Sequence, residues 1–456
     1  MFMSRVQKNN TGLFAMLFAL FIVVFSICGC GGENSEDGNG GESGEVASGG
    51  WDYVSVKQID ARGLLSPHVS VKIGSDNQAY VVYFESTVPE DPEDSVAYTI
   101  NHVIWDMEDL ALHDEEEIIL EEVDNCSGLG FSLDSDNFPV VAYQGGELRQ
   151  CGQEHQSDAM LSIRENDEWD EYVGGIGEVD TDRNPVFTDG LAGADISIAF
   201  DSQGDVHLCY QFKYEGCDSM NFAFPDLCYV KKIRSGLSDN VPEEIVEGNY
   251  YAGPGTGIQN AVGDHCVITV DNNDEPAIFY YAELPPSQGD TKGLRVARRQ
   301  GGVWNKEWVE EGCEIGHISA VCDNNGRLAV AYYATQYTDG QGYPHTHCLK
   351  YARESGSSSW DIELVDETTL CGDYCSLAFN SSGLPAIAYY SQKSHSGYDL
   401  NDLKLVRFNG VSWDREVVHS TGDIGLYNSL WFDSNDRALI CSYSNTEKLI
   451  YAFFER

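Results

Sequence analysis

Basic side chains are scarce in this chain of 456 residues. Lys and Arg together number 27 against 74 Asp and Glu, which gives a formal net charge of −47. A surface of this kind repels the phosphates of nucleic acids and the headgroups of anionic lipids. We therefore predict no nucleic-acid partner. The charge suits a cation, a basic partner, or the solvated acidic surface of a secreted or salt-adapted protein.

The sequence also lacks helical periodicity. No segment after residue 27 repeats apolar residues with the period of about 3.6 that an amphipathic helix needs. Apolar residues instead alternate with polar ones in short runs, which is typical of half-buried β-strands. Because the hydrophobic content is 42%, the chain can still bury a core, and we predict an all-β fold.

The N-terminal residues predict a targeting segment followed by a tether. Arg5 and Lys8 precede the apolar run Leu13–Ile27, which is too short to span a membrane comfortably and is placed like the core of a signal peptide. The stretch GGENSEDGNGGESGEVASGG, Gly31–Gly50, has almost nothing to bury. We expect a signal peptide over residues 1–30, a flexible tether over 31–50 and one folded domain over 51–456.

The segment Ile27-Cys28-Gly29-Cys30 resembles the lipoprotein box of bacteria, in which an aliphatic and two small residues precede the lipidated cysteine. The resemblance implies cleavage before Cys30 and acylation of Cys30, and several acyl chains would anchor the protein to a membrane. Gly31 stands where an Asp often marks inner-membrane retention, so we expect the outer membrane or cell surface. An ordinary secretory signal or an uncleaved anchor is the alternative.

One pattern recurs seven times along the chain, about 50 to 70 residues apart. It is a short alternating strand, a turn rich in Asp, Asn, Ser and Gly, and a second strand that usually ends in Tyr. The clearest copy is CSLAFNSSGLPAIAYY, Cys375–Tyr390. The seven turns begin at Gly74, Asp134, Asp201, Asp271, Asp323, Asn380 and Asp433.

Two further strand signals follow each pair, and a Trp often opens the last one, as at Trp360 and Trp413. Four strands in a repeat of this length predict a blade of a seven-bladed β-propeller. The final repeat stops after its third strand at Arg456, whereas Trp51-Asp52 begins a strand of the fourth type. We predict that the N-terminal strand completes the last blade and closes the ring, so that no strand edge is left open.

These repeats resemble the secreted β-propeller repeats of bacteria, which are distant relatives of the sialidase-like and WD-repeat propellers. The resemblance covers residues 51–456 and implies the architecture. The Trp-Asp pair opens the fourth strand here, whereas in WD repeats it closes the third. The sialidase Asp-box is absent from every blade, and no arginine triad can be assigned, so the resemblance does not extend to sialidase activity.

Alignment of the blades on the turn predicts a candidate site. The residues six positions before each turn should meet at one mouth of the central channel, and we name them the mouth ring. Histidine binds metals and transfers protons near neutral pH, and a carboxylate can orient it. His265 and His317 are therefore candidate ligands of a divalent metal, although solvated polar residues would also fit these positions. The mouth ring consists of His68, Gly128, Asp195, His265, His317, Tyr374 and Tyr427.

Other residues share positions between blades, and we interpret most of them as structural. Serines four positions before the turn lack a Gly-x-Ser-x-Gly elbow and suit a crowded axis. Tyrosines nine positions after the turn should fill the space between blades. The Asp-rich turns suit turn chemistry better than calcium binding. His345 and His347 with Cys348, in a long loop, form a weak metal fragment.

Cysteine is plentiful, and an exported chain meets an oxidising compartment, so some disulfides are expected. Cys217 and Cys228 flank one loop and are our first pair, with Cys126 and Cys151 second. Apolar strand patterns instead predict buried free thiols at Cys209, Cys266 and Cys441.

Three functions fit these features. The sequence favours a lipid-anchored binding module that presents its loops to a protein or a glycan. The first alternative is a hydrolase or lyase acting on polysaccharide at the channel mouth, with His265 or His317 as base or metal ligand, Asp195 as orienting group and Tyr374 or Tyr427 as acid. The second is a structural subunit of an envelope complex.

Overall fold

The computed structural model describes residues 50–58, 68–87, 97–108, 117–123, 128–145, 156–165, 168–175, 190–214, 226–236, 243–248, 261–284, 289, 291–337, 344–356, 359–368, 370–392 and 401–456. Contacts group residues Glu45–Arg456 into one compact unit. Within the described ranges there is no α-helix, and one short 3₁₀ turn covers Arg234–Gly236. None of these residues forms a helix that could cross a membrane.

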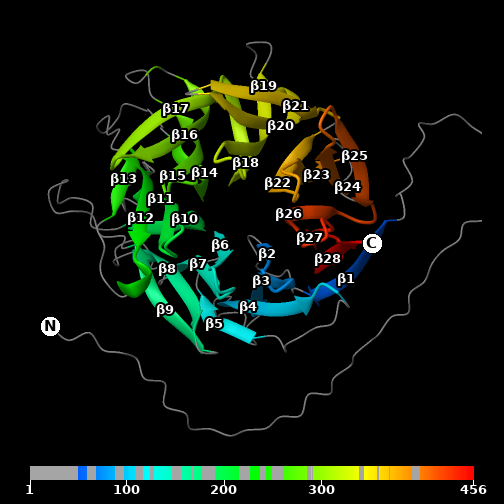
Figure 1. Cartoon of the computed structure of the whole chain (residues 1–456), viewed down its shortest axis with the longest axis horizontal. Helices are drawn as coiled ribbons and strands as arrows, with labels where there is room; N and C mark the ends of the chain where they lie inside the picture. The colour runs from blue at the N-terminus through cyan, green and yellow to red at the C-terminus, as the bar shows by residue number, and fades with distance from the viewer. Residues whose placement is uncertain are drawn as a thin grey trace, which may run out of the picture. The chain divides into compact units, whose positions relative to one another are not determined.

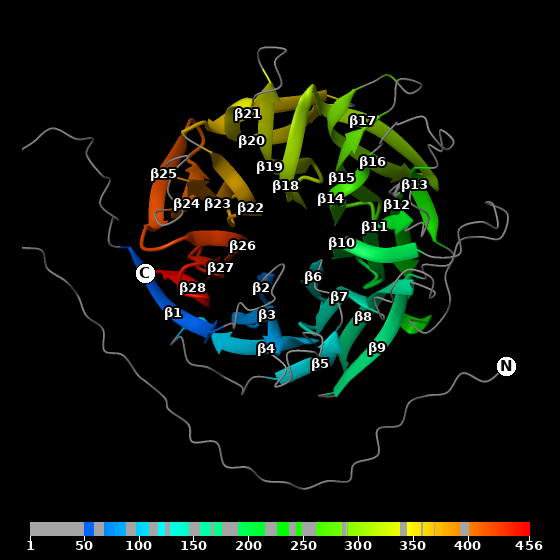
Figure 2. The same ribbon diagram turned by 180° about the vertical axis from the view of Figure 1, so that it is seen from behind.

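Seven blades of four antiparallel strands surround one axis, which confirms the predicted fold (Figure 1). The innermost strands face the axis in the reverse view as well (Figure 2). The first three blades are β2 (Val69–Ile73), β3 (Gln78–Thr87), β4 (Ala97–Asp106), β5 (Glu117–Val123); β6 (Leu129–Leu133), β7 (Pro139–Gly145), β8 (Gln156–Glu165), β9 (Glu168–Gly175); and β10 (Gly190–Phe200), β11 (Val206–Tyr214), β12 (Asp226–Lys232), β13 (Glu244–Glu247).

The next three blades are β14 (Ala261–Val270), β15 (Pro276–Glu283), β16 (Lys292–Gln300), β17 (Val303–Glu311); β18 (Cys313–Cys322), β19 (Leu328–Tyr337), β20 (Pro344–Gly356), β21 (Ser359–Asp366); and β22 (Cys371–Phe379), β23 (Pro385–Gln392), β24 (Asn401–Phe408), β25 (Trp413–His419). The seventh blade contains β26 (Ile424–Phe432), β27 (Ala438–Ser444), β28 (Leu449–Glu455) and β1 (Trp51–Gln58).

The seventh blade joins the two ends of the propeller, as the orphan strands predict. β1 pairs antiparallel with β28, with Trp51 opposite Glu455. The backbone amide of Arg456 donates a hydrogen bond to the carbonyl of Gly50 at 2.9 Å. The Trp51 side chain also hydrogen-bonds Glu416 of the sixth blade. The N-terminal strand therefore holds its own blade and the neighbouring blade together.

The turns between first and second strands follow turn chemistry rather than calcium chemistry. In the third blade, the Asp201 carboxylate accepts hydrogen bonds from the backbone amides of Gln203 and Asp205 at 3.0 and 2.9 Å. Asp134, Asp271, Asp323 and Asp433 repeat this pattern. The fourth turn residue has positive φ in every blade, which favours Asn, Asp or Gly. These residues are Asn77, Asn137, Gly204, Asp274, Gly326, Gly383 and Asp436.

The hydrophobic core lies between the blades rather than within any one of them. Each of seven clusters in the described part of the chain joins residues of two neighbouring blades, including the first with the last. The six aligned tyrosines belong to this core, and the hydroxyls of four of them donate to acidic side chains, as in Tyr389 with Asp366 at 2.6 Å. A structural role for these tyrosines is therefore confirmed.

The axial serines also connect blades. Ser197, Ser319 and Ser376 each accept a hydrogen bond from a backbone amide of the next blade's inner strand, at 3.2, 2.9 and 2.9 Å. Ser429 accepts one from Val71 at 2.9 Å across the closure of the ring. These serines pack the axis, as the sequence predicts.

Cysteines in the described ranges form no disulfide with one another. Cys209, Cys266 and Cys441 are buried free thiols, which confirms that prediction. Cys228 is buried in β12, whereas Cys217 lies outside the described residues, as do Cys126 and Cys151. The two disulfide pairs therefore stay predictions.

Candidate functional site

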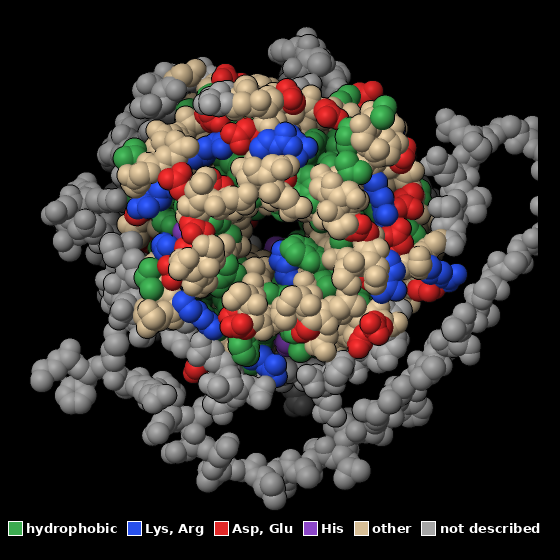
Figure 3. Space-filling view, in the orientation of Figure 1, with side chains coloured by type: hydrophobic (Ala, Val, Ile, Leu, Met, Phe, Trp, Pro, Cys, Tyr) green, Lys and Arg blue, Asp and Glu red, His purple; other side chains and the backbone are tan. Residues whose placement is uncertain are grey.

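A channel of about 500 Å³ runs along the propeller axis. Its wall is built from the seven innermost strands, and a space-filling view shows its opening on one face (Figure 3). All seven members of the mouth ring line it. Gly128 contributes no side chain to the ring. A Cβ at this position would lie only 2.9 Å from the backbone nitrogen of Ile196, so a larger residue would not fit.

The backbone is unusual at four of these positions. Asp195, His265, Tyr374 and Tyr427 have φ of 50°, 56°, 49° and 52°, a left-handed conformation that costs about 1–3 kcal/mol for such residues. Strand register shifts at each of these sites, so each lies at a β-bulge. Bulges re-aim side chains and concentrate next to active sites. The repeated strain therefore points to a function for the mouth ring.

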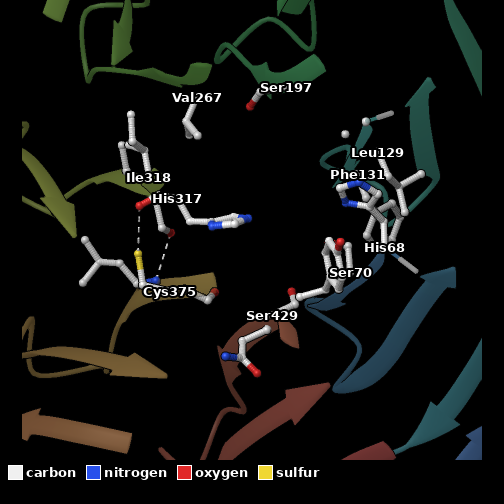
Figure 4. A pocket seen from close by; sticks show the side chains of 18 of the residues that line it. His68, Ser70, Leu129, Phe131, Ser197, Val267, His317, Ile318, Cys375 and Ser429 are labelled. Atoms are coloured by element: carbon white, nitrogen blue, oxygen red, sulfur yellow. Dashed lines mark hydrogen bonds between the residues drawn. The ribbon is translucent and has the colours of Figure 1, made fainter. Parts of the chain in front are cut away.

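The side chains form an unbroken arc around the mouth. Asp195 accepts a hydrogen bond from the backbone amide of His265 at 3.2 Å. Along the arc, ring centroids lie 5.3 Å apart for His265 and His317, 4.0 Å for His317 and Tyr374, 4.6 Å for Tyr374 and Tyr427, and 4.9 Å for Tyr427 and His68. In the close view, His317 points into the channel and His68 lies on the opposite wall (Figure 4).

A carboxylate outside the mouth ring fixes His317. Nδ1 of His317 donates a hydrogen bond to Asp373 at 2.5 Å, because a carboxylate can only accept. Nε2 is then left as the ring nitrogen that can accept a proton from a molecule in the channel. Burial alone would raise the pKa of Asp373, but the hydrogen bond from His317 lowers it below its usual value. The group predicted to orient a histidine, Asp195, instead binds backbone.

Sequence reasoning missed Asp373, although a signal was present. Asp373 directly precedes Tyr374 of the mouth ring, and Asp264 directly precedes His265 in the same way. The position directly before the mouth ring therefore carries an acidic residue in two blades, and alignment of that position shows the pattern. The bulge brings Asp373 to His317 of the neighbouring blade, and strand alternation alone does not predict that contact.

The environment also sets the charge of the other members of the arc. Burial, and then the neighbouring Tyr427, raise the pKa of Tyr374 well above its usual range, so this hydroxyl stays protonated. Burial lowers the pKa of His265, although the nearby Asp195 opposes this effect. Burial and then the proximity of His317 lower the pKa of His68 to about 4. His68 and His265 are therefore mainly neutral at neutral pH.

We expect His68 to make the fold sensitive to acid. Its pKa is about 4 in the folded chain against 6.5 unfolded, so between these values only the unfolded chain takes up the proton. The free energy of unfolding therefore does not depend on His68 protonation above pH 6.5. It falls by up to roughly 3 kcal/mol as the pH approaches 4. Urea unfolding at neutral and acid pH should show a smaller loss for His68→Gln than for the wild type. Equal losses would contradict this assignment.

The described residues contain no group of three or more His, Cys, Asp or Glu side chains arranged to hold a metal ion. His265 and His317 lie close enough to share a ligand, but His317 already binds Asp373. We therefore derive no step through a metal. In the loop fragment, His347 contacts Tyr333 and Thr335, and the side chain of His345 lies outside the described residues.

Neither a known family's sequence pattern nor the sequence of a curated protein matches the chain. Its structure is similar to that of an ulvan lyase from a new family of polysaccharide lyases, with 11% identity, a TM-score of 0.51, and coverage of 88% of this chain and 96% of that one. The same type of enzyme bound to GlcA(1-4)Rha3S gives 10% identity, a TM-score of 0.51 and the same coverage. A protein of unknown function from Dyadobacter fermentans is 10% identical, with a TM-score of 0.46 and coverage of 89% of this chain and 99% of that one. The two likenesses to ulvan lyase show a shared fold.

Proposed function

We propose that this protein is a lyase that cleaves a uronate-containing polysaccharide by β-elimination at the channel mouth. The pair of His317 and Tyr374 carries the proposal, because it places an oriented base beside a protonated acid. A binding module, which the sequence alone favoured, needs no such pair. The arrangement therefore supports the polysaccharide-acting alternative.

The proposed reaction balances with these two groups. Nε2 of His317 removes the proton from C5, the carbon next to the sugar's carboxylate, and that electron pair forms the C4=C5 double bond. The C4–O4 bond breaks, its electrons pass to the glycosidic oxygen, and the Tyr374 hydroxyl protonates that oxygen. A tyrosine with a raised pKa keeps its proton until so basic a leaving group develops. Solvent then returns a proton from His317 to Tyr374.

The same lining disfavours hydrolysis. Most glycosidases use two carboxyl groups on either side of the scissile bond. Asp195 is the only carboxylate among the described residues that line the channel, and no arginine lines it in those ranges. The hydrolase alternative would thus lack its second carboxyl group, which elimination does not require.

The comparison with ulvan lyase also supports a uronate polymer as the substrate. The ulvan lyase with the same architecture is a polysaccharide lyase, and the saccharide bound to its counterpart contains GlcA, a uronate. At 11% identity the shared fold says nothing of shared residues. The substrate class is therefore tested best through the residues of this chain.

Changing Asp373 to Asn tests the orientation of His317. We expect kcat to fall by about 10- to 100-fold with KM nearly unchanged, because the amide can hold the ring in the wrong tautomer without blocking the channel. Asp264→Asn is the matched control at the same position of the fourth blade, where the carboxylate contacts Gln211. Equal effects of the two changes would count against the proposal.

Salt should increase activity at low ionic strength. A chain of net charge −47 repels a polyanionic substrate, and salt screens this repulsion to within about 10 Å at 0.1 M. We expect kcat/KM to rise several-fold between about 10 and 200 mM NaCl, through KM rather than kcat. A fall over this range would mean that the substrate is not an anionic polymer.

The location remains part of the proposal. A lipid on Cys30 would anchor the protein in the bacterial envelope, and residues 31–50 would tether the propeller within reach of polysaccharide at the cell surface. Cys30 and residues 31–49 lie outside the described residues. Metabolic labelling with a radioactive fatty acid, lost on Cys30→Ser, tests the anchor.

A further inference from the structure

A lysine lies deeper in the axial channel than the mouth ring. Side chains alternate along β2, so His68 just before it, Ser70 and Lys72 line the channel at successive levels. With a rise of about 3.3 Å per residue, Lys72 is roughly 13 Å along the strand from His68. A group bound at Lys72 would therefore occupy a place distinct from the proposed lyase site.

Lys72 differs from other lysines of the propeller in its partners. Lys231, Lys292 and Lys350 bond carboxylates at 2.7, 2.7 and 2.5 Å. In the described part of the chain Lys72 has no carboxylate within ion-pair distance, and its Nζ lies 4.2 Å from the centre of the Trp431 ring. The only carboxylate described in the channel wall is Asp195 of the mouth ring. The half-buried ammonium group thus has no counter-charge among the described residues, and an anionic ligand would supply one.

The pKa of Lys72 agrees with this geometry. Burial lowers it from 10.5 to about 8, and no neighbouring acid offsets the burial. An anion placed beside the amine would stabilise its charged form and raise the pKa again. Lys72 therefore offers a measurable signal of anion binding.

Ser70 supplies a second donor at this site. Four equivalent serines bond a backbone amide of the neighbouring blade, whereas the hydroxyl of Ser70 makes no such bond within the described ranges. Ser70 and Lys72 stand on the same side of β2 and can donate to one acceptor group. Trp431 lines the channel beside them. Figure 3 shows basic and hydrophobic side chains together at the wall of the opening.

We propose that Lys72, Ser70 and Trp431 form a binding site for a small oxyanion, such as sulfate, phosphate or a carboxylate, within the axial channel. The site does not depend on the proposed lyase activity. The net charge of the protein opposes anions at long range, so the ammonium and hydroxyl contacts must supply the attraction at short range. A divalent oxyanion should therefore bind better than chloride.

Calorimetric titration of the full chain with sodium sulfate, at constant ionic strength held with sodium chloride, tests this site. The wild type should bind sulfate, Lys72→Met should weaken binding at least ten-fold, and Lys72→Arg should retain most of it. Lys448→Met is the control, because Lys448 is half-buried like Lys72 but bonds Asn445 and does not line the channel. Sulfate should also raise the pKa of Lys72, followed by NMR of 13C-methylated lysines, from about 8 to about 9 or higher.

The source of the anion is resolved by comparing ligands. Tighter binding of glucose 6-sulfate than of inorganic sulfate would identify a sugar-borne group as the ligand, and the reverse order would identify a free anion. Either order supports the site if Lys72→Met removes it. The proposal is overturned if the wild type binds neither ligand, or if Lys72→Met binds them as tightly as the wild type does. Neither result bears on His317 and Tyr374, so the lyase proposal is tested separately.

Discussion

Replacing His317 by Ala is expected to lower kcat on a uronate-containing polysaccharide by about 10³-fold, within the range that a positioned general base contributes. The imidazole is held by Asp373 at 2.5 Å and points into the channel. Tyr374→Phe should cause a loss of similar size, because the leaving oxygen would then have no proton donor. The double variant should lose little more than either single variant, because the two groups act in one step.

Controls for these variants lie elsewhere in the propeller. His419→Ala removes a histidine that packs against Tyr53 and Phe453 on the outer side of the seventh blade, and it should leave kcat within about two-fold of the wild type. Circular dichroism and thermal unfolding would show that all variants remain folded. Activity of His317→Ala within ten-fold of the wild type would remove His317 from the role of base.

Deleting β1 together with Gly50, residues 50–58, is expected to destabilise the whole propeller by about 5 kcal/mol or more. The deletion removes the strand paired with β28 and the Trp51 side chain, and losing a packed Trp alone costs about 3–5 kcal/mol. Lost backbone hydrogen bonds add about 1 kcal/mol each. Because each blade packs on its neighbours, the loss should appear as one cooperative transition at much lower temperature.

A chain that begins at Gly50 is the control, and it should unfold at the same temperature as the full chain. A synthetic peptide of residues 50–58 should restore part of the lost stability to the shortened chain, because strand pairing with β28 can occur in trans. An unchanged melting temperature after the deletion would mean that β1 does not close the ring.

The architecture could be predicted from the sequence because its signals are local and repeated. A turn that needs left-handed backbone selects Asn, Asp or Gly whatever lies around it, as at Asn77 and Asp436, and seven such turns set the alignment of the blades. The closure followed from counting strands. The mouth ring followed from the same alignment, because a residue six positions before the turn has the same height in each blade.

The chemistry of the site was harder to predict because it depends on contacts between blades. Asp373 reaches His317 only because a bulge turns the strand at Tyr374, and Gly372, with φ of 106°, approaches Leu349 too closely for any side chain. Lys72 has no carboxylate partner among the described residues because no acidic side chain of a neighbouring blade reaches it. Such features arise from the packing of distant segments, which period and spacing do not record.

Product analysis tests the central claim most directly. The full chain would be incubated with a panel of uronate-containing polysaccharides in water enriched in ¹⁸O, and the new chain ends analysed by mass spectrometry and ultraviolet absorbance. We predict new non-reducing ends with a C4=C5 double bond, without ¹⁸O incorporation by the enzyme. His317→Ala should form these ends about 10³-fold more slowly. Saturated non-reducing ends, together with ¹⁸O at C1 of the new reducing ends, would identify a hydrolase, and no cleavage of any polymer in the panel would contradict the lyase proposal.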